Sequence, residues 1–73
     1  MSQDRHQAPR LSETEIWILS EIVKGTSAAE VALRLLVYRD TVTKRLREIF
    51  RKIGVQTKTE AAAWLERPRR RSA

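Results

Sequence analysis

The residues best suited to chemistry in this chain of 73 residues are cationic, and they are concentrated in one segment. The chain holds 15 Lys and Arg against nine Asp and Glu, for a net charge of +6. Residues 38–58 contain seven basic and two acidic residues, a local charge of +5, whereas residues 11–37 carry −2. Such a concentration of positive charge indicates a polyanionic partner, with nucleic acid as the first expectation.

The sequence lacks the residues that a metal site, a cofactor site or an enzyme active site would need. The chain has no cysteine, and its one histidine, His6, has no partner at metal-ligand spacing. No acid/base pair, activated nucleophile or Gly-rich phosphate loop is present, so we expect neither an enzyme nor a metal or other cofactor. The apolar runs are too short to span a membrane and the first ten residues are polar, which favours a cytoplasmic protein.

Helices must hold the cationic segment in place, and the residues typical of helix starts and helix ends predict four helices. Ser12 with Glu15 and Ser27 with Glu30 have the spacing of capping boxes, and Gly25 and Gly54 supply helix ends. Thr57 or Thr59 is a candidate cap for the last helix. The predicted helices cover residues 13–24, 28–36, 39–53 and 60–67. Residues 1–10 are expected to be a flexible leader, residues 11–67 one domain and residues 68–73 a basic tail.

Apolar residues recur at helical spacing and no segment alternates at strand spacing, so the fold class is all-α. The residues expected to face the core are Ile16, Leu19, Ile22 and Val23 in the first helix, Val31, Ala32 and Leu35 in the second, and Val42, Leu46, Ile49, Phe50 and Ile53 in the third. The second and third helices, joined by a tight turn, have the outline of a helix-turn-helix. Lys44, Arg47, Glu48 and Arg51 then point outward. Alternatively, Lys44, Glu48 and Lys52 form i, i+4 ion pairs on an ordinary solvated surface.

The spacing of these residues resembles the LuxR/GerE-type DNA-binding domain over about residues 11–65. The matching residues are Leu11-Ser12, Glu15, Leu19, Gly25, Ser27, Glu30-Val31-Ala32, Leu35, Thr41-Val42, Ile49, Lys52-Ile53-Gly54-Val55, Lys58 and Ala61-Ala62. The resemblance implies a four-helix bundle, here as a stand-alone chain, that binds duplex DNA through its third helix. It also implies a homodimer formed through the fourth helix, around Ala62, Ala63 and Trp64.

The resemblance also implies roles for individual residues. It places Thr43, Lys44 and Arg47 at the base edges, and Thr41, Arg45, Arg51 and Lys58 near phosphates. Ser27, at the start of the second helix, is a further candidate phosphate contact. The chain departs from the family pattern at several positions. Tyr38 replaces the usual Ser or Thr cap of the third helix, Thr43 replaces a lysine, Arg45 replaces a histidine, and Ala28 and Ala29 replace an Asn-Lys pair that touches phosphates.

Several residues allow two interpretations. Ser27 and the amides after it form either an anion site or a simple helix cap. The Tyr38 hydroxyl either contacts a phosphate or leans over the helix junction. Trp64 packs in the core or at a dimer face, or serves as a base-stacking platform. The run Arg69 to Arg71 either follows the DNA backbone or is a solubilising tail.

Two large apolar residues lie on faces expected to be polar. Trp17 projects away from Leu19, and Leu33 projects away from Val31 and Leu35. We expect these residues to form a surface for a regulatory protein partner, unless the leader folds over Trp17. The function favoured by the sequence is a small sequence-specific DNA-binding transcriptional regulator. The alternative is a protein-interaction module that keeps the fold and modulates another regulator or RNA polymerase.

Overall fold

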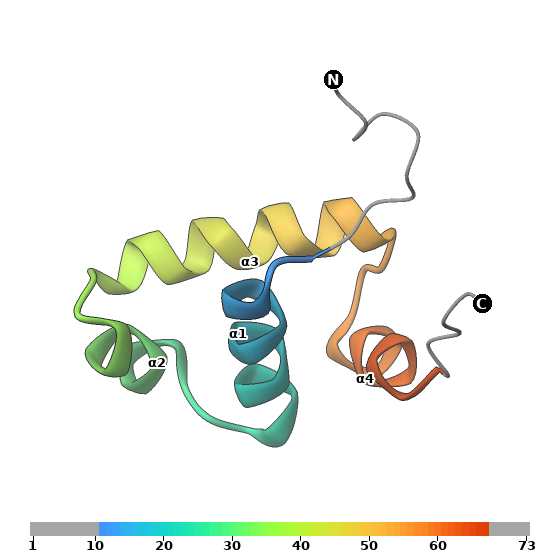
Figure 1. The fold of residues 1–73 in the computed structure, drawn as a ribbon, viewed down its shortest axis with the longest axis horizontal. Coiled ribbons are helices and arrows are strands. Elements are labelled where there is room, and N and C mark those ends of the chain that lie inside the picture. Colours follow the sequence, from blue (N-terminus) through green and yellow to red (C-terminus); the bar gives the residue numbers. More distant parts are fainter. Residues whose placement is uncertain (1–10, 68–73) are drawn as a thin grey trace.

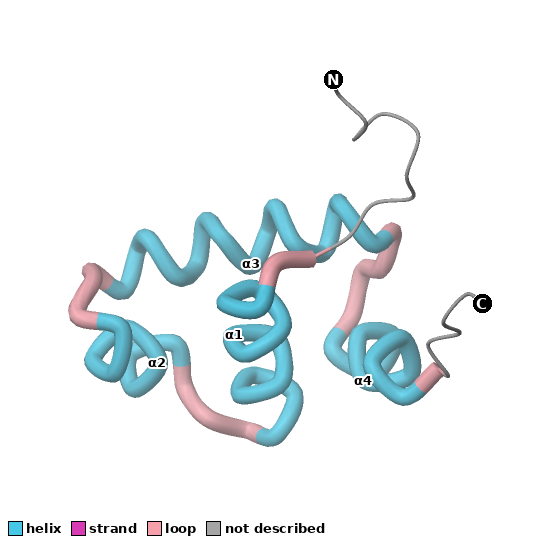
Figure 2. Tube along the Cα trace, viewed as in Figure 1, coloured by secondary structure: helices cyan, strands magenta, loops and turns pink. Residues whose placement is uncertain are grey.

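Four helices make up the part of the protein that the structure describes. A computed structural model describes residues 11–67, which contain no strand. The helices are α1 (Glu13–Lys24), α2 (Ala28–Leu35), α3 (Arg39–Ile53) and α4 (Lys58–Glu66). The predicted all-α, four-helix bundle with a helix-turn-helix is confirmed. Figure 1 shows α3 along one side of the bundle with the other three helices beneath it, and Figure 2 shows that only short loops join them.

The ends of α1 and α3 lie where the sequence predicts them. The Ser12 hydroxyl accepts a hydrogen bond from the Glu15 amide at 3.1 Å, and the Glu15 carboxylate accepts one from the Ser12 amide at 2.9 Å. This complete capping box satisfies two amides that have no partner inside the helix. Gly25 (φ 108°) ends α1 and Gly54 (φ 73°) ends α3. Both adopt the left-handed conformation that glycine enters without steric cost.

The core lies between the four helices, and α1 contacts each of the other three. The fully buried residues with the largest side chains are Leu19, Val31, Val42 and Ile49. All four were predicted to face inward. Leu35, Leu46, Phe50, Ile53, Trp64 and Leu65 are half-buried and pack against this cluster. The apolar stripes of α2 and α3 are therefore confirmed.

The prediction for α1 is confirmed at Leu19 and Ile22 but wrong in part, because the buried face of this helix is rotated toward Glu15 and Ile18. Its buried residues are Glu15, Ile18, Leu19, Glu21 and Ile22, whereas Ile16 and Val23 are only half-buried. Trp17 is half-buried and packs against the core, so the expectation that it stands on an open surface is also wrong. Apolar periodicity alone missed the true face because two of its positions hold carboxylates.

The α2 helix begins at Ala28 as predicted, whereas the remaining helix ends differ by one or two residues from the prediction. The α2 helix ends at Leu35, and Leu36 adopts a left-handed conformation (φ 59°) although it is not glycine. Only half of the second capping box forms, because Ser27 caps the Glu30 amide while the Glu30 carboxylate pairs with Arg34. Thr57 caps α4, which begins at Lys58 rather than at residue 60.

Candidate nucleic-acid interface

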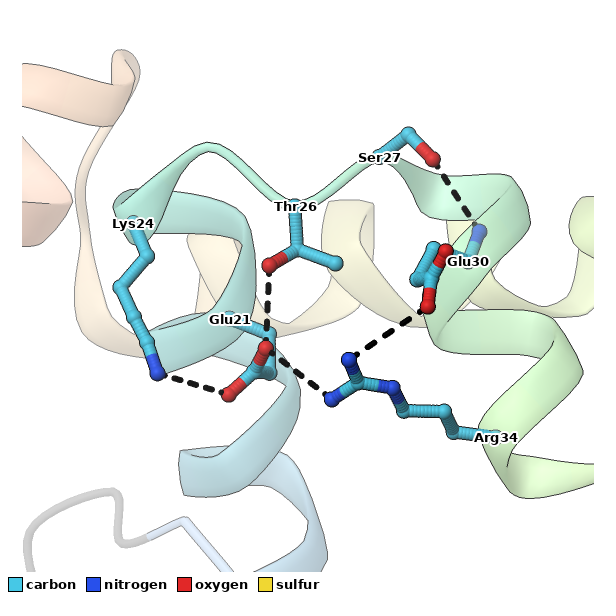
Figure 3. Close-up of polar contacts among 6 residues, drawn as sticks. All are labelled: Glu21, Lys24, Thr26, Ser27, Glu30 and Arg34. Carbon is cyan, nitrogen blue, oxygen red and sulfur yellow. Dashed lines mark hydrogen bonds and ion pairs between the residues drawn. The ribbon is translucent and has the colours of Figure 1, made fainter.

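The turn between α1 and α2 is held by one buried carboxylate. Glu21 accepts hydrogen bonds from Lys24 Nζ and from Thr26 Oγ1, each at 3.0 Å, and lies 3.5 Å from Arg34 Nη1 (Figure 3). These contacts, led by the Lys24 hydrogen bond and followed by that of Thr26, lower the pKa of Glu21. Because Arg34 belongs to α2, the carboxylate ties the first helix of the helix-turn-helix to α1.

A second carboxylate holds α3 against α1. Lys52 Nζ donates to both oxygens of Glu15, at 3.0 and 3.2 Å. The Ser12 amide is the main cause that lowers the pKa of Glu15, burial opposes it, and Lys52 and Arg45 lower it further. Lys52 is therefore a structural cation. The alternative in which Lys44, Glu48 and Lys52 pair along the helix surface is wrong, because no such ion pair exists within residues 11–67.

The outward face of α3 carries cations without partners. Lys44, Arg47 and Arg51 lie on the side opposite Val42 and Ile49, and we call these three residues the cationic ridge. All three are exposed, and none makes an ion pair with another residue of the described chain. The ridge thus presents its positive charge to solvent at the edge of the bundle formed by α3 (Figure 1).

Thr43 lies beside the ridge and has a defined orientation. Its hydroxyl donates to the Arg39 carbonyl oxygen at 3.2 Å, one helical turn earlier. The donor is therefore used inside the helix. What remains for a ligand is the methyl group and the lone pairs of the oxygen, which suit a thymine methyl or a base amino group.

The residues expected near phosphates do not lie on one element. Thr41 and Arg45 are on the flank of α3 that faces α1, where they join Thr14 around a pocket of about 180 Å³. Arg51 belongs to the ridge. Ser27 precedes α2 and its hydroxyl already caps the helix, while Lys58 is the first residue of α4 and is exposed.

The α4 residues expected at the dimer face differ in exposure. Trp64 is half-buried and packs against the core, which confirms its packing role. Ala62 is half-buried and Ala63 is exposed. Arg69 to Arg71 lie outside the described residues.

Two features escaped the sequence analysis. Asp40 is exposed one turn before Lys44 and on the same face of α3. Its spacing of four residues from Lys44 could have revealed this position from the sequence.

The second feature is apolar. The large hydrophobic side chains that are exposed within residues 11–67 fall in a single stretch: Leu33 (69%), Leu36 (88%), Val37 (41%) and Tyr38 (83%). We call this stretch the apolar patch. Only Leu33 was expected there.

Tyr38 directly precedes α3, and its side chain does not cap the helix. Its backbone has the extended conformation of a cap residue, but its side chain makes no capping hydrogen bond, as its phenol predicts. The first turn of α3 therefore lacks side-chain acceptors for its free amides.

Within residues 11–67 no helix has both the length and the apolar character needed to cross a bilayer. Residues 11–67 also contain no group of three or more His, Cys, Asp or Glu side chains that could hold a metal ion.

An all-α bundle whose helix-turn-helix exposes unpaired cations on its second helix is a DNA-binding domain in architecture. The comparison with known families agrees. The chain belongs to the family described as bacterial regulatory proteins, luxR family (GerE), whose pattern matches residues 9–65.

Among curated proteins, the chain is similar to the transcriptional regulatory protein YdfI of Bacillus subtilis (strain 168). The two are 36% identical over 61 residues, which cover 84% of this chain and 28% of YdfI. The chain thus spans little more than a quarter of the length of that relative. No solved structure matches the chain significantly.

Proposed function

We propose that this protein is a sequence-specific transcriptional regulator whose helix α3 reads the major groove of duplex DNA. The observation that carries the proposal is the cationic ridge, which is exposed and unpaired, whereas Lys24, Arg34 and Lys52 are bound by carboxylates. Lys44 and Arg47 are assigned to guanine N7 and O6, and Thr43 to a neighbouring base. Ser27, Thr41, Arg45, Arg51 and Lys58 are assigned to phosphates, which set the register of the helix in the groove.

The proposal includes a homodimer. Ala62, Ala63 and Trp64 of α4 are assigned to the contact between two copies. A symmetric dimer would place two α3 helices in successive major grooves, so its half-sites lie about one helical turn apart, roughly 34–36 Å.

The decisive experiment is selection of bound duplexes from a random pool at about 150 mM salt, where non-specific binding is weak. Wild-type protein is expected to enrich a palindromic site. Arg47→Ala should lose about 1–3 kcal/mol on that site and relax selectivity at one position, whereas Lys58→Ala should weaken all sequences alike. The combined Lys44→Ala/Arg47→Ala variant is the negative control. If wild type and this control enrich nothing and bind DNA equally, the proposal is wrong.

A second candidate function is favoured by the apolar patch. Four exposed apolar side chains within residues 33–38 are unusual on a small domain and are typical of a protein contact surface. In this case the fold would serve as an interaction module that acts on another regulator or on RNA polymerase. Leu33→Glu distinguishes the two: it should leave DNA selection unchanged under the first proposal and abolish partner capture and regulation under the second.

A further inference from the structure

Asp40 is the one acidic residue in line with the cationic ridge. With about 100° per residue, Asp40 lies about 40° from Lys44 and about 20° from Arg47 around the axis of α3. Glu48, the other acid of this helix, lies about 80° from Asp40, toward α1, where it lines a pocket with Glu15, Arg51 and Lys52. Asp40 therefore shares the direction in which the ridge faces a duplex.

Asp40 also has no partner inside the described part of the molecule. It precedes Lys44 by four residues, the order in which an acid and a base attract one another along a helix. Nevertheless, no ion pair joins them within residues 11–67, and Asp40 is exposed. Its carboxylate is free to accept hydrogen bonds from a ligand.

The chemistry of the major groove restricts what a carboxylate can accept. The donors there are cytosine N4 and adenine N6, whereas guanine and thymine present no hydrogen-bond donor to the groove. Adenine also places its N7 acceptor beside N6, which repels the second carboxylate oxygen. Cytosine is therefore the favoured base. Its guanine partner presents O6 and N7 to a cation, and Lys44 lies one turn along the same face.

We infer that Asp40 determines specificity for a C·G base pair, with its carboxylate accepting from cytosine N4 while Lys44 contacts the paired guanine. This inference rests on the proposed function. The carboxylate also repels phosphates, so it disfavours registers in which the first turn of α3 meets the backbone. Asp40 thus adds selectivity that the cations do not supply, because cations attract every duplex.

The test compares the sites that wild type, Asp40→Asn and Glu48→Gln select from a random duplex pool. Wild type is expected to enrich cytosine at one position of each half-site. Asp40→Asn should enrich adenine at that position, because an asparagine amide pairs with adenine N6 and N7. Glu48→Gln removes the same charge from the same helix and should keep the wild-type motif. Asp40→Ser is a second variant, expected to show no preference at the position.

Binding measurements on purified duplexes make the test quantitative. Wild type should bind the C·G duplex about 5- to 150-fold more tightly than one with T·A at this position, and Asp40→Asn should lose this ratio. A wild-type motif without a preferred cytosine, or the same motif and ratio for wild type and both Asp40 variants, would overturn the inference and leave the proposed function standing. If wild type selects no site at all, the proposed function itself fails. Circular dichroism checks that each variant keeps its helices.

Discussion

Replacing Lys52 with methionine tests whether this cation stabilises the fold, in contrast to the cations of the ridge, which are available to DNA. Lys52 Nζ lies 3.0 Å from Glu15 Oε1 and 3.2 Å from Oε2, and the pair joins α3 to α1 through two residues that are 37 positions apart in sequence. Glu15 is buried, so Lys52→Met leaves its carboxylate with the Ser12 amide and a more distant Arg45. Methionine keeps the length and apolar stem of the lysine.

The expected loss of stability follows from the burial of the two partners. A hydrogen bond to a charged group contributes about 1.5–3 kcal/mol, but the Lys52 side chain is 41% exposed and solvent screens the pair. We therefore expect Lys52→Met to lower the free energy of unfolding by about 1–2 kcal/mol at neutral pH. For a domain of this size that corresponds to a fall in Tm of about 5–15 °C.

Lys44→Met is the matched control, because it removes the same charge from an exposed position of the same helix. Its stability should stay within about 0.5 kcal/mol of wild type, and its affinity for DNA should fall. Thermal and urea unfolding of both variants, with DNA binding measured well below Tm, are the assays. If the two variants are equally destabilised, the structural role of Lys52 is refuted.

The pH dependence tests the same ion pair independently. The pKa of Glu15 is lowered from 4.5 in the folded state, so its interactions contribute stability that is present above about pH 4.5. That contribution is lost as the pH falls through the folded-state pKa. The gap between wild type and Lys52→Met should therefore be constant from about pH 6 to 8 and shrink below about pH 4.5. A gap that stays unchanged down to about pH 3 would show that lost packing, not charge, caused the destabilisation.

Three further predictions follow from the helix ends and the charge. Leu36→Asn should raise the free energy of unfolding in urea by about 0.5–1 kcal/mol, because Leu36 is 88% exposed and a left-handed leucine costs about 1–2 kcal/mol; a loss of stability would contradict this. Tyr38→Ser should stabilise by about 1 kcal/mol by supplying the missing cap of α3, and unchanged DNA affinity would exclude a phosphate contact by the phenol. If each protomer neutralises about five phosphates, log K should fall with log salt at a slope of about −4 to −5 per protomer, and a slope near zero would contradict the phosphate assignments.

Much of the architecture could be predicted because local signals and tertiary structure agree. Ser12 and Gly25 bound α1, and Gly54 ends α3, at the predicted residues because caps and left-handed glycines act within a single turn. The α3 stripe was also correct, since Val42 and Ile49 are fully buried and the charged residues of this helix all lie outside its buried face. The outward position of Lys44 and Arg47 followed directly from that stripe.

The errors arise where a distant contact overrides the local pattern. Glu15 is buried in a core-facing position where the Ser12 amide and Lys52, from another helix, both bind its carboxylate, and no periodicity within α1 could reveal the distant partner. The same contact removed Lys52 from the expected surface pairs with Glu48. Leu36 escaped notice for a related reason: the packing of α2 and α3 imposes a left-handed residue where the sequence offers no glycine.

Some cations of this fold are paired with carboxylates and others are not, and this difference links the fold to the proposed function. Carboxylates of α1 and α2 bind Lys24, Arg34 and Lys52, which lie where helices must be held together. Three of the four acids of these two helices, Glu15, Glu21 and Glu30, are used in this way, and none of them pairs with the cations on the outer face of α3. Neutralising Glu15 or Glu21 should therefore weaken DNA binding indirectly, by loosening the position of α3 or α2, even though neither carboxylate can approach a phosphate favourably.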